Sequence, residues 1–196
     1  MLALTELQQE ILTELLNIGV GSASATLSTL LNSEISLSVP QLVFITQQEV
    51  LDRFNQKENL IAHDTFTGDI SGDAFLLFTE AEQFSLTQEM LHAAPNQEID
   101  ELDLLQEVAN IVIHNCLGSL SNNLKAPLEL GIPRSYRGHF PEEEKKAFTN
   151  TAIVLYVDMN FAVKDKGISG FLSLMMDTTG LNKLKIKLDA YMAQFC

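Results

Sequence analysis

The first 31 positions carry apolar residues at the spacing of an amphipathic helix. The periodic positions are Leu7, Ile11, Leu12, Leu15, Leu16 and Ile18, and the pattern resumes at Leu27, Leu30 and Leu31. This spacing predicts a helix with one buried face, and Thr5 stands where an N-cap is expected. Gly19 and Gly21 interrupt it. Because an interior glycine costs about 1 kcal/mol relative to alanine, they indicate close approach of another backbone.

Further elements follow from runs of apolar residues and from turn residues. Residues 42–45 predict a short strand, and residues 69–78 predict a turn that leads into a strand. Residues 80–94 have a helical pattern, and a second long helix is expected over residues 99–124. Residues 152–159 and 171–176 predict strands, with a turn at residues 167–170 between them, and a final helix is expected from about Thr179.

The two halves of the chain share one sequence pattern. Shifting residues 6–40 by 93 positions matches nine of 35 residues without a gap. The matches are Leu12 with Leu105, Glu14 with Glu107, Asn17 with Asn110, Ile18 with Ile111, Leu27 with Leu120, Ser28 with Ser121, Leu31 with Leu124, Leu37 with Leu130 and Pro40 with Pro133. Residues 70–72 match residues 168–170 at an offset of 98, which implies five inserted residues.

These two long repeats favour one domain over a short-period array. We expect residues 1–98 and 99–196 to form a single unit with a pseudo-twofold axis, in which strands of both halves join one sheet. The predicted fold class is therefore α+β, with a central, mainly antiparallel sheet and two long helices that pack together.

Charge and composition exclude several classes of partner. The 12 Lys and Arg residues are outnumbered by 26 Asp and Glu residues, which gives a net charge of −14. Such a charge opposes binding to nucleic acid or to an anionic membrane surface. The chain shows no signal-peptide pattern and no apolar run of 18 residues, so a cytoplasmic location is expected. Its two cysteines have no spacing typical of a metal site or a disulfide.

Two polar pairs recur at the register of the repeat. Glu14 with Asn17, and Glu107 with Asn110, are three residues apart and therefore share a helix face. Glu10 and Asp103 extend the two faces by one turn. A single such pair is common on a solvated helix, but its recurrence at equivalent positions favours a function because exposed positions otherwise vary freely.

At these residues the chain resembles the CheC, CheX and FliY family of chemotaxis phosphatases. The family signature is Asp or Ser, three residues, Glu, two residues, Asn, twenty-two residues, Pro. The second copy matches it at every position, with Asp103, Glu107, Asn110 and Pro133. The first copy matches with Glu14, Asn17 and Pro40 but carries Glu10 in place of Asp or Ser. Two sites in about 200 residues are most similar to the CheC branch.

The resemblance implies hydrolysis of the aspartyl phosphate on a CheY-like response regulator. Asn17 and Asn110 would orient the attacking water, and Glu14 and Glu107 would pair with the regulator's active-site lysine. No cofactor of the chain's own is implied, because the regulator's carboxylates hold the Mg²⁺ ion. Pro40 and Pro133 are expected to end the segment after each helix. CheD is a further partner that the resemblance implies.

Two alternatives stay open at this point. The same helices could bind a response regulator or CheD without catalysis, as an adaptor does. A metal-dependent hydrolase of small molecules would instead need a buried cluster of histidines and carboxylates. The best candidates, His63, Asp64, Asp69 and Asp73, read as polar residues around a turn and match no EF-hand.

Other residue groups carry weaker signals. Gly19 and Gly21 follow a helix and lack the lysine of a phosphate-binding loop. His114 and Cys116 are two apart on a helix and point to different faces, so they cannot form a nucleophile pair. Residues 141–146 are most simply a solvated loop.

The charge is unevenly divided between the repeats. Residues 1–98 contain 14 acidic and 2 basic residues, whereas residues 99–196 contain 12 acidic and 10 basic residues. Since the phosphorylated pocket of a receiver is itself acidic, we expect Glu107 and Asn110 to form the more active site.

Overall fold

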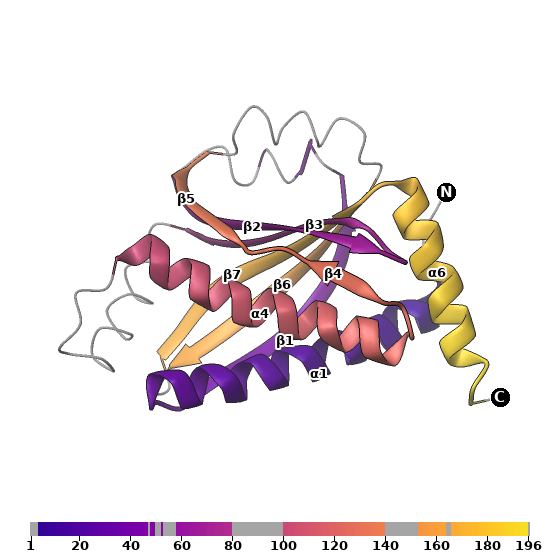
Figure 1. The fold of residues 1–196 in the computed structure, drawn as a ribbon, viewed down its shortest axis with the longest axis horizontal. Helices are drawn as coiled ribbons and strands as arrows, with labels where there is room; N and C mark the ends of the chain where they lie inside the picture. Colours follow the sequence, from indigo (N-terminus) through magenta and orange to yellow (C-terminus); the bar gives the residue numbers. More distant parts are fainter. Residues whose placement is uncertain are drawn as a thin grey trace.

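The computed structural model describes residues 4–46, 48–49, 52, 58–79, 100–139, 153–163 and 166–195. In chain order its elements are α1 (Glu6–Leu31), β1 (Ile35–Ile45), β2 (Asn59–Gly68), β3 (Gly72–Thr79), α4 (Glu101–Asn123), β4 (Leu128–Leu130), β5 (Arg134–Gly138), β6 (Ile153–Val163), β7 (Lys166–Met176) and α6 (Thr178–Met192). Figure 1 shows the long helices α1 and α4 along one side of the sheet, with α6 at one end.

The strands of both halves join one seven-stranded sheet. Its order is β1-β6-β7-β3-β2-β4, and β5 also pairs with β2. Every pairing among the described strands is antiparallel. Strand β1, which follows α1 in the first half, pairs with β6 of the second-half hairpin β6–β7. Strands β4 and β5, which follow α4 in the second half, pair with β2 of the first-half hairpin β2–β3. This exchange of edge strands is the arrangement that a pseudo-twofold repeat predicts, and the α+β class with a mainly antiparallel sheet is confirmed.

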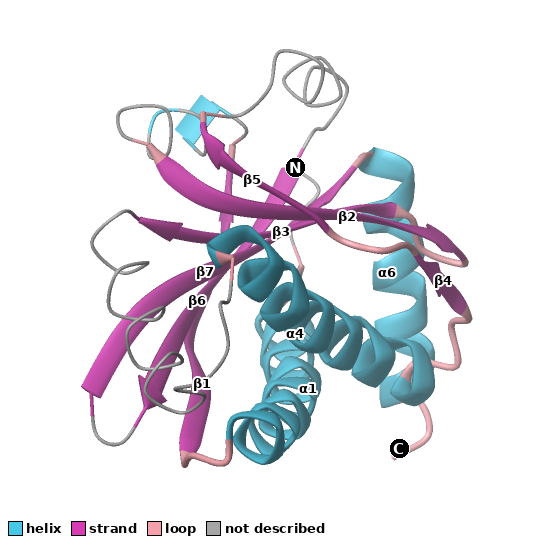
Figure 2. Ribbon diagram, turned by 60° about the vertical axis from the view of Figure 1, so that its left-hand side comes forward, coloured by secondary structure: helices cyan, strands magenta, loops and turns pink. Residues whose placement is uncertain are grey.

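The main core lies between the sheet and the two long helices. It contains fully buried residues of α1 such as Leu12 and Leu16, of α4 such as Val112, and of the sheet such as Leu76 and Leu172. A smaller cluster around Ile61, Phe75 and Leu77 lies on the opposite face of the sheet. Figure 2 shows α1 and α4 together on the same face. The helices therefore present their outer faces on one side of the molecule.

The predicted helices are confirmed in place and nearly in length. Thr5 caps α1 through a capping box in which its hydroxyl accepts from Gln8 N at 3.2 Å. The helix expected over residues 99–124 is α4, and the final helix begins at Thr178. The helix predicted over residues 80–94 and the loop over residues 141–146 lie outside the described residues.

Several strand predictions need correction. The strand expected at residues 42–45 begins at Ile35, and the turn expected at residues 167–170 lies inside β7. Strand β2 is not predicted by the sequence pattern, because the polar residues His63 and Asp64 are typical of a turn, whereas in the structure they lie within the strand. Strands β4 and β5 are not predicted either. Both are short and lack a buried alternating pattern.

One of the two helical glycines lies where the backbones of α1 and α4 meet. A Cβ atom on Gly19 would lie 2.6 Å from Cys116 Cα and 2.7 Å from the Asn115 carbonyl oxygen. The predicted close approach is therefore confirmed for Gly19. It is wrong for Gly21, because a Cβ there would meet no atom within 4 Å. Among the described helices, none is both long enough and apolar enough to cross a membrane.

Candidate functional site

The first predicted site lies on the N-terminal half of α1. Glu10 and Glu14 are exposed and Asn17 is half-buried. Glu10 and Glu14 also line a shallow surface depression with Glu6, so three carboxylates are close together here. Within the described part of the chain, the side chains of Glu14 and Asn17 take part in no hydrogen bond or ion pair. Their polar groups are available to a partner.

The second predicted site has the same exposure pattern on α4. Asp103 and Glu107 are exposed and Asn110 is half-buried. Asp100 caps this helix by accepting hydrogen bonds from the backbone N–H groups of its first turn. Arg137 of β5 forms an ion pair with Glu101 at the start of α4. That ion pair lies at the helix N-terminus, and among the described residues no basic side chain pairs with the motif carboxylates of either site.

The two prolines of the signature differ in their surroundings. Pro40 lies inside β1, where the pairing with β6 shifts register between Ser38 and Gln41. A proline is tolerated there because β1 is an edge strand with an irregularity, where no ladder hydrogen bond is required of it. Pro133 is buried just before β5. The expectation that both prolines end a segment is therefore wrong for Pro40.

The two helices cross in an antiparallel direction. Ser22 Oγ donates a hydrogen bond to Asn115 Oδ1 at 2.7 Å, and Ser119 Oγ donates to the Leu15 carbonyl oxygen at 2.6 Å. Residues later in α1 therefore contact residues earlier in α4. The two Glu-x-x-Asn faces consequently lie on opposite sides of the helix crossing.

An open groove of about 380 Å³ lies beside the crossing. It is lined by Ile18, Gly19 and Ser22 of α1 and by α4 residues that include His114 and Asn122. No carboxylate lines it, and the side chain of Ile18 is 56% exposed. The groove thus offers a contact surface without carboxylates next to Asn17 in a strongly acidic protein.

His114 is a further candidate for the second site. It follows Glu107 by seven positions and Asn110 by four, so it shares their helix face. Its Nε2 atom lies 3.3 Å from Oδ2 of the buried Asp64 on β2. Asp64 Oδ1 also accepts from Thr65 N at 2.8 Å. The helical spacing from Asn110 was a signal for His114, but its pairing with Asp64 depends on the packing of α4 against β2.

The other candidates have structural explanations. His63 Nε2 lies 2.8 Å from Asp73 Oδ1 across the β2–β3 pair, and the His63 ring stacks on Phe75. Burial raises the pKa of the Cys116 thiol to about 12, so it has almost no thiolate at neutral pH and is a poor nucleophile. Among the described residues, no group of three or more His, Cys, Asp or Glu side chains could hold a metal ion.

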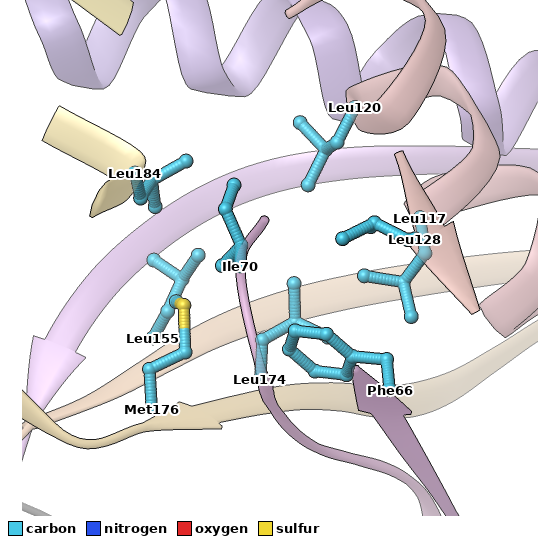
Figure 3. Close-up of a pocket in the computed structure, with 9 residues that line it drawn as sticks. All are labelled: Phe66, Ile70, Leu117, Leu120, Leu128, Leu155, Leu174, Met176 and Leu184. Carbon is cyan, nitrogen blue, oxygen red and sulfur yellow. The ribbon is translucent and has the colours of Figure 1, made fainter. Parts of the chain in front are cut away.

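A small cavity in the core offers no ligand site. Figure 3 shows its lining, which consists of apolar side chains from the sheet, α4 and α6, including Phe66, Leu117 and Leu184. Its volume is about 10 Å³. That is at the lower limit for a single water molecule, and an apolar void of this size stays empty. This cavity therefore has no room for a functional ligand.

Comparison with known proteins relates this geometry to a family. The model of the CheC-like family matches residues 7–44, which include Glu14, Asn17 and Pro40. Over 139 residues the chain is 30% identical to the CheY-P phosphatase CheC of Bacillus subtilis (strain 168), a match that covers 65% of each protein. The chain is thus similar to members of the CheC-like family.

Two further relatives support this assignment. The CheC-like chain is 24% identical over 136 residues to the flagellar motor switch phosphatase FliY of the same organism, which covers 67% of the chain and 36% of FliY. The crystal structure of Thermotoga maritima FliY superposes with a TM-score of 0.76 over 96% of the chain and 99% of that structure, at 18% identity. The matches thus span less than two thirds of either curated relative, and the structural likeness establishes a shared fold.

Proposed function

We propose that this CheC-like protein hydrolyses the aspartyl phosphate of a CheY-like response regulator through its two Glu-x-x-Asn faces. The observation that carries the proposal is the equal presentation of the two pairs. In each, an exposed glutamate precedes a half-buried asparagine by one turn on the outer face of a long helix. The name of one curated relative, CheY-P phosphatase CheC, supplies the substrate class, and FliY is also named a phosphatase.

Asn17 and Asn110 have the chemistry needed to position water. A carboxamide offers both donors and an acceptor, so it can hold a water molecule in line with phosphorus while it tolerates the phosphoryl oxygens. It is neutral, and it therefore avoids the repulsion that a carboxylate would feel. Their half-buried positions restrict the side-chain rotamers, which lowers the entropy lost when the water is oriented.

Glu14 and Glu107 are suited to docking. Each is exposed one turn before its asparagine, and a contact with the receiver's active-site lysine would be a charge-assisted hydrogen bond. The Mg²⁺ ion of this chemistry would be held by the receiver's own carboxylates, and it neutralises charge on the phosphoryl group. Under this proposal the phosphatase forms no covalent intermediate.

The decisive experiment measures the decay of a phosphorylated CheY-like receiver with catalytic amounts of the protein. We expect wild type to accelerate decay and the double variant Asn17→Ala with Asn110→Ala to lose this by at least about 10²-fold, because the water is no longer positioned. Asn182→Ala, at an exposed position of α6, is the matched control and should behave as wild type.

The same assay separates the proposal from the adaptor alternative. Binding of the phosphorylated receiver without any acceleration by the wild-type protein would support an adaptor and contradict hydrolysis. Equal decay with wild type and with the double variant would show that the asparagines have no catalytic role.

A further inference from the structure

We infer that the two Glu-x-x-Asn faces form one docking surface that holds a single receiver domain at a time. The inference rests on the proposed function and adds to it the number of receivers bound and the way in which the sites compete.

Two contacts between equivalent residues mark a pseudo-twofold axis. Ser22 and Asn115, which are hydrogen-bonded across the helix crossing, are 93 positions apart, the offset that relates the two motifs. Phe75 of β3 lies opposite Ser173 of β7, and these residues are 98 positions apart, the offset that relates the two Ile-Ser-Gly sequences. Equivalent residues can face each other in this way only where an axis passes between them. The axis therefore runs from the sheet through the helix crossing.

This axis places both sites on the same side of the molecule. A rotation about it leaves directions along it unchanged, so a side chain that points away from the sheet has an equivalent that also points away. Both helices lie on the same face of the sheet (Figure 2). The equal exposure of Glu14 and Glu107, and of Asn17 and Asn110, agrees with this geometry.

The sites are close to each other compared with a receiver domain. Asn17 precedes Ser22 by five residues, and Asn110 precedes Asn115 by five residues. With a rise of 1.5 Å per residue and helix axes about 8–10 Å apart, the two asparagines of this antiparallel pair are roughly 15–20 Å apart. A folded domain of about 100 residues has a radius of gyration near 13 Å, and its diameter is therefore about 30 Å or more.

Two receivers docked on the same side at this spacing would overlap. The helix crossing, where the groove lined by Ser22 and His114 lies, is five residues from each asparagine along its own helix. A receiver centred on either site would cover it. The repeats therefore provide two alternative orientations for one partner, related by the pseudo-twofold axis, and two independent turnovers cannot proceed at once.

Competition between the sites has a kinetic consequence. A site that still binds the receiver but cannot hydrolyse it becomes a non-productive position, and it withdraws receivers from the intact site. Asn17→Ala creates such a position, whereas Glu14→Lys should prevent docking at the first site through repulsion of the receiver's lysine. At saturating receiver, Glu14→Lys should therefore turn over faster than Asn17→Ala, by about twofold if both sites bind equally. Independent sites would give the two variants the same rate.

The experiment combines stoichiometry and kinetics. The receiver is held in its phosphorylated-like state with beryllium fluoride and Mg²⁺, and the complex with the full chain is weighed by native mass spectrometry at excess receiver. We expect one receiver per chain for wild type, for Glu14→Lys and for Glu107→Lys, and no binding for the double variant. We also expect Glu14→Lys to turn over faster than Asn17→Ala.

Each other outcome is decisive. Two receivers on wild type, or equal turnover of Glu14→Lys and Asn17→Ala alongside an active wild type, would overturn the single-receiver inference and leave the phosphatase proposal standing. A wild-type protein that neither binds the receiver nor accelerates its dephosphorylation would remove both. Each variant must unfold at the same urea concentration as wild type, so that a change in turnover does not reflect a loss of folding. Because Glu14 is exposed, we expect its substitution to leave this midpoint unchanged.

Discussion

Gly19 of α1 and Cys116 of α4 are in backbone contact, because a Cβ atom at Gly19 would lie 2.6 Å from Cys116 Cα. The substitution Gly19→Ala must therefore separate the helices, and we expect a loss of about 1–3 kcal/mol in the free energy of unfolding. Gly21→Ala is the matched control. It meets no atom within 4 Å and should stabilise the protein by up to about 1 kcal/mol through helix propensity. Urea denaturation measures both, and equal effects would contradict the close contact.

The hydrogen bond between Ser22 and Asn115 should appear as a coupling energy. Ser22→Ala removes it at an exposed position, so we expect a cost of about 0.5–1 kcal/mol and a coupling of similar size with Asn115→Ala in a double-mutant cycle. Thr29→Ala is the control, because its hydroxyl bonds only to Ala25 within α1. The changes in the free energy of unfolding caused by Thr29→Ala and Asn115→Ala should add. If those of Ser22→Ala and Asn115→Ala also add, the contact is refuted.

Burial makes the Cys116 thiol unreactive in the folded protein. Its pKa is raised from the ordinary 9.0 to about 12. In a Cys196→Ser variant, a thiol reagent at pH 8 should react only after denaturation in urea. Because the unfolded thiol ionises above pH 9 while the folded thiol stays protonated to about pH 12, this residue should lower stability as pH rises through that interval. Cys116→Ala should remove that part of the pH dependence. Rapid labelling of the native protein would contradict its burial.

His114 should contribute to the second site alone. It lies one turn after Asn110, whereas the equivalent position of the first repeat is Gly21. We expect His114→Ala to reduce dephosphorylation in the Asn17→Ala background, where only the second site is active, because it removes a partly exposed polar ring one turn from Asn110 on the same helix face. In the Asn110→Ala background it should have little effect. The assay is receiver dephosphorylation, and equal losses in both backgrounds would point to a general effect on folding.

The two sites should differ in their response to salt. The first half of the chain carries 14 acidic and 2 basic residues, and Glu6, Glu10 and Glu14 lie together beside Asn17. Repulsion should slow encounter there at low ionic strength and should weaken as salt screens it. We therefore expect Asn110→Ala to lose more activity than Asn17→Ala at low salt, with a smaller difference at moderate salt. Equal losses at both salts would contradict the asymmetry.

The helices and the motifs were predictable because their signals are local. The spacing of Leu12, Leu15 and Leu16 defines a buried helix face wherever that helix packs, and Thr5 forms its cap with residues three positions away. The recurrence of Glu14 and Asn17 at Glu107 and Asn110 required only a comparison of the two halves. Exposure of each pair was the expected result for polar residues on the outer faces of such helices.

The strands were harder to predict because their stability comes from distant partners. Strand β2 tolerates His63 and Asp64 since Asp73 and His114 provide their polar contacts from 10 and 50 residues away. Pro40 is accommodated in β1 because that strand lies at the sheet edge with an irregular register. None of these compensating contacts is visible in a local sequence pattern.

The sequence by itself determined the two long helices, their buried faces and the duplicated Glu-x-x-Asn pairs, because helix periodicity and capping act over a few residues. Only the tertiary structure decided that the helices cross antiparallel at Gly19, that each hairpin is flanked by a strand of the other half, and that both helices lie on one face of the sheet. These features depend on side-chain packing and strand pairing between residues about 100 positions apart, which the free energy of the whole fold selects.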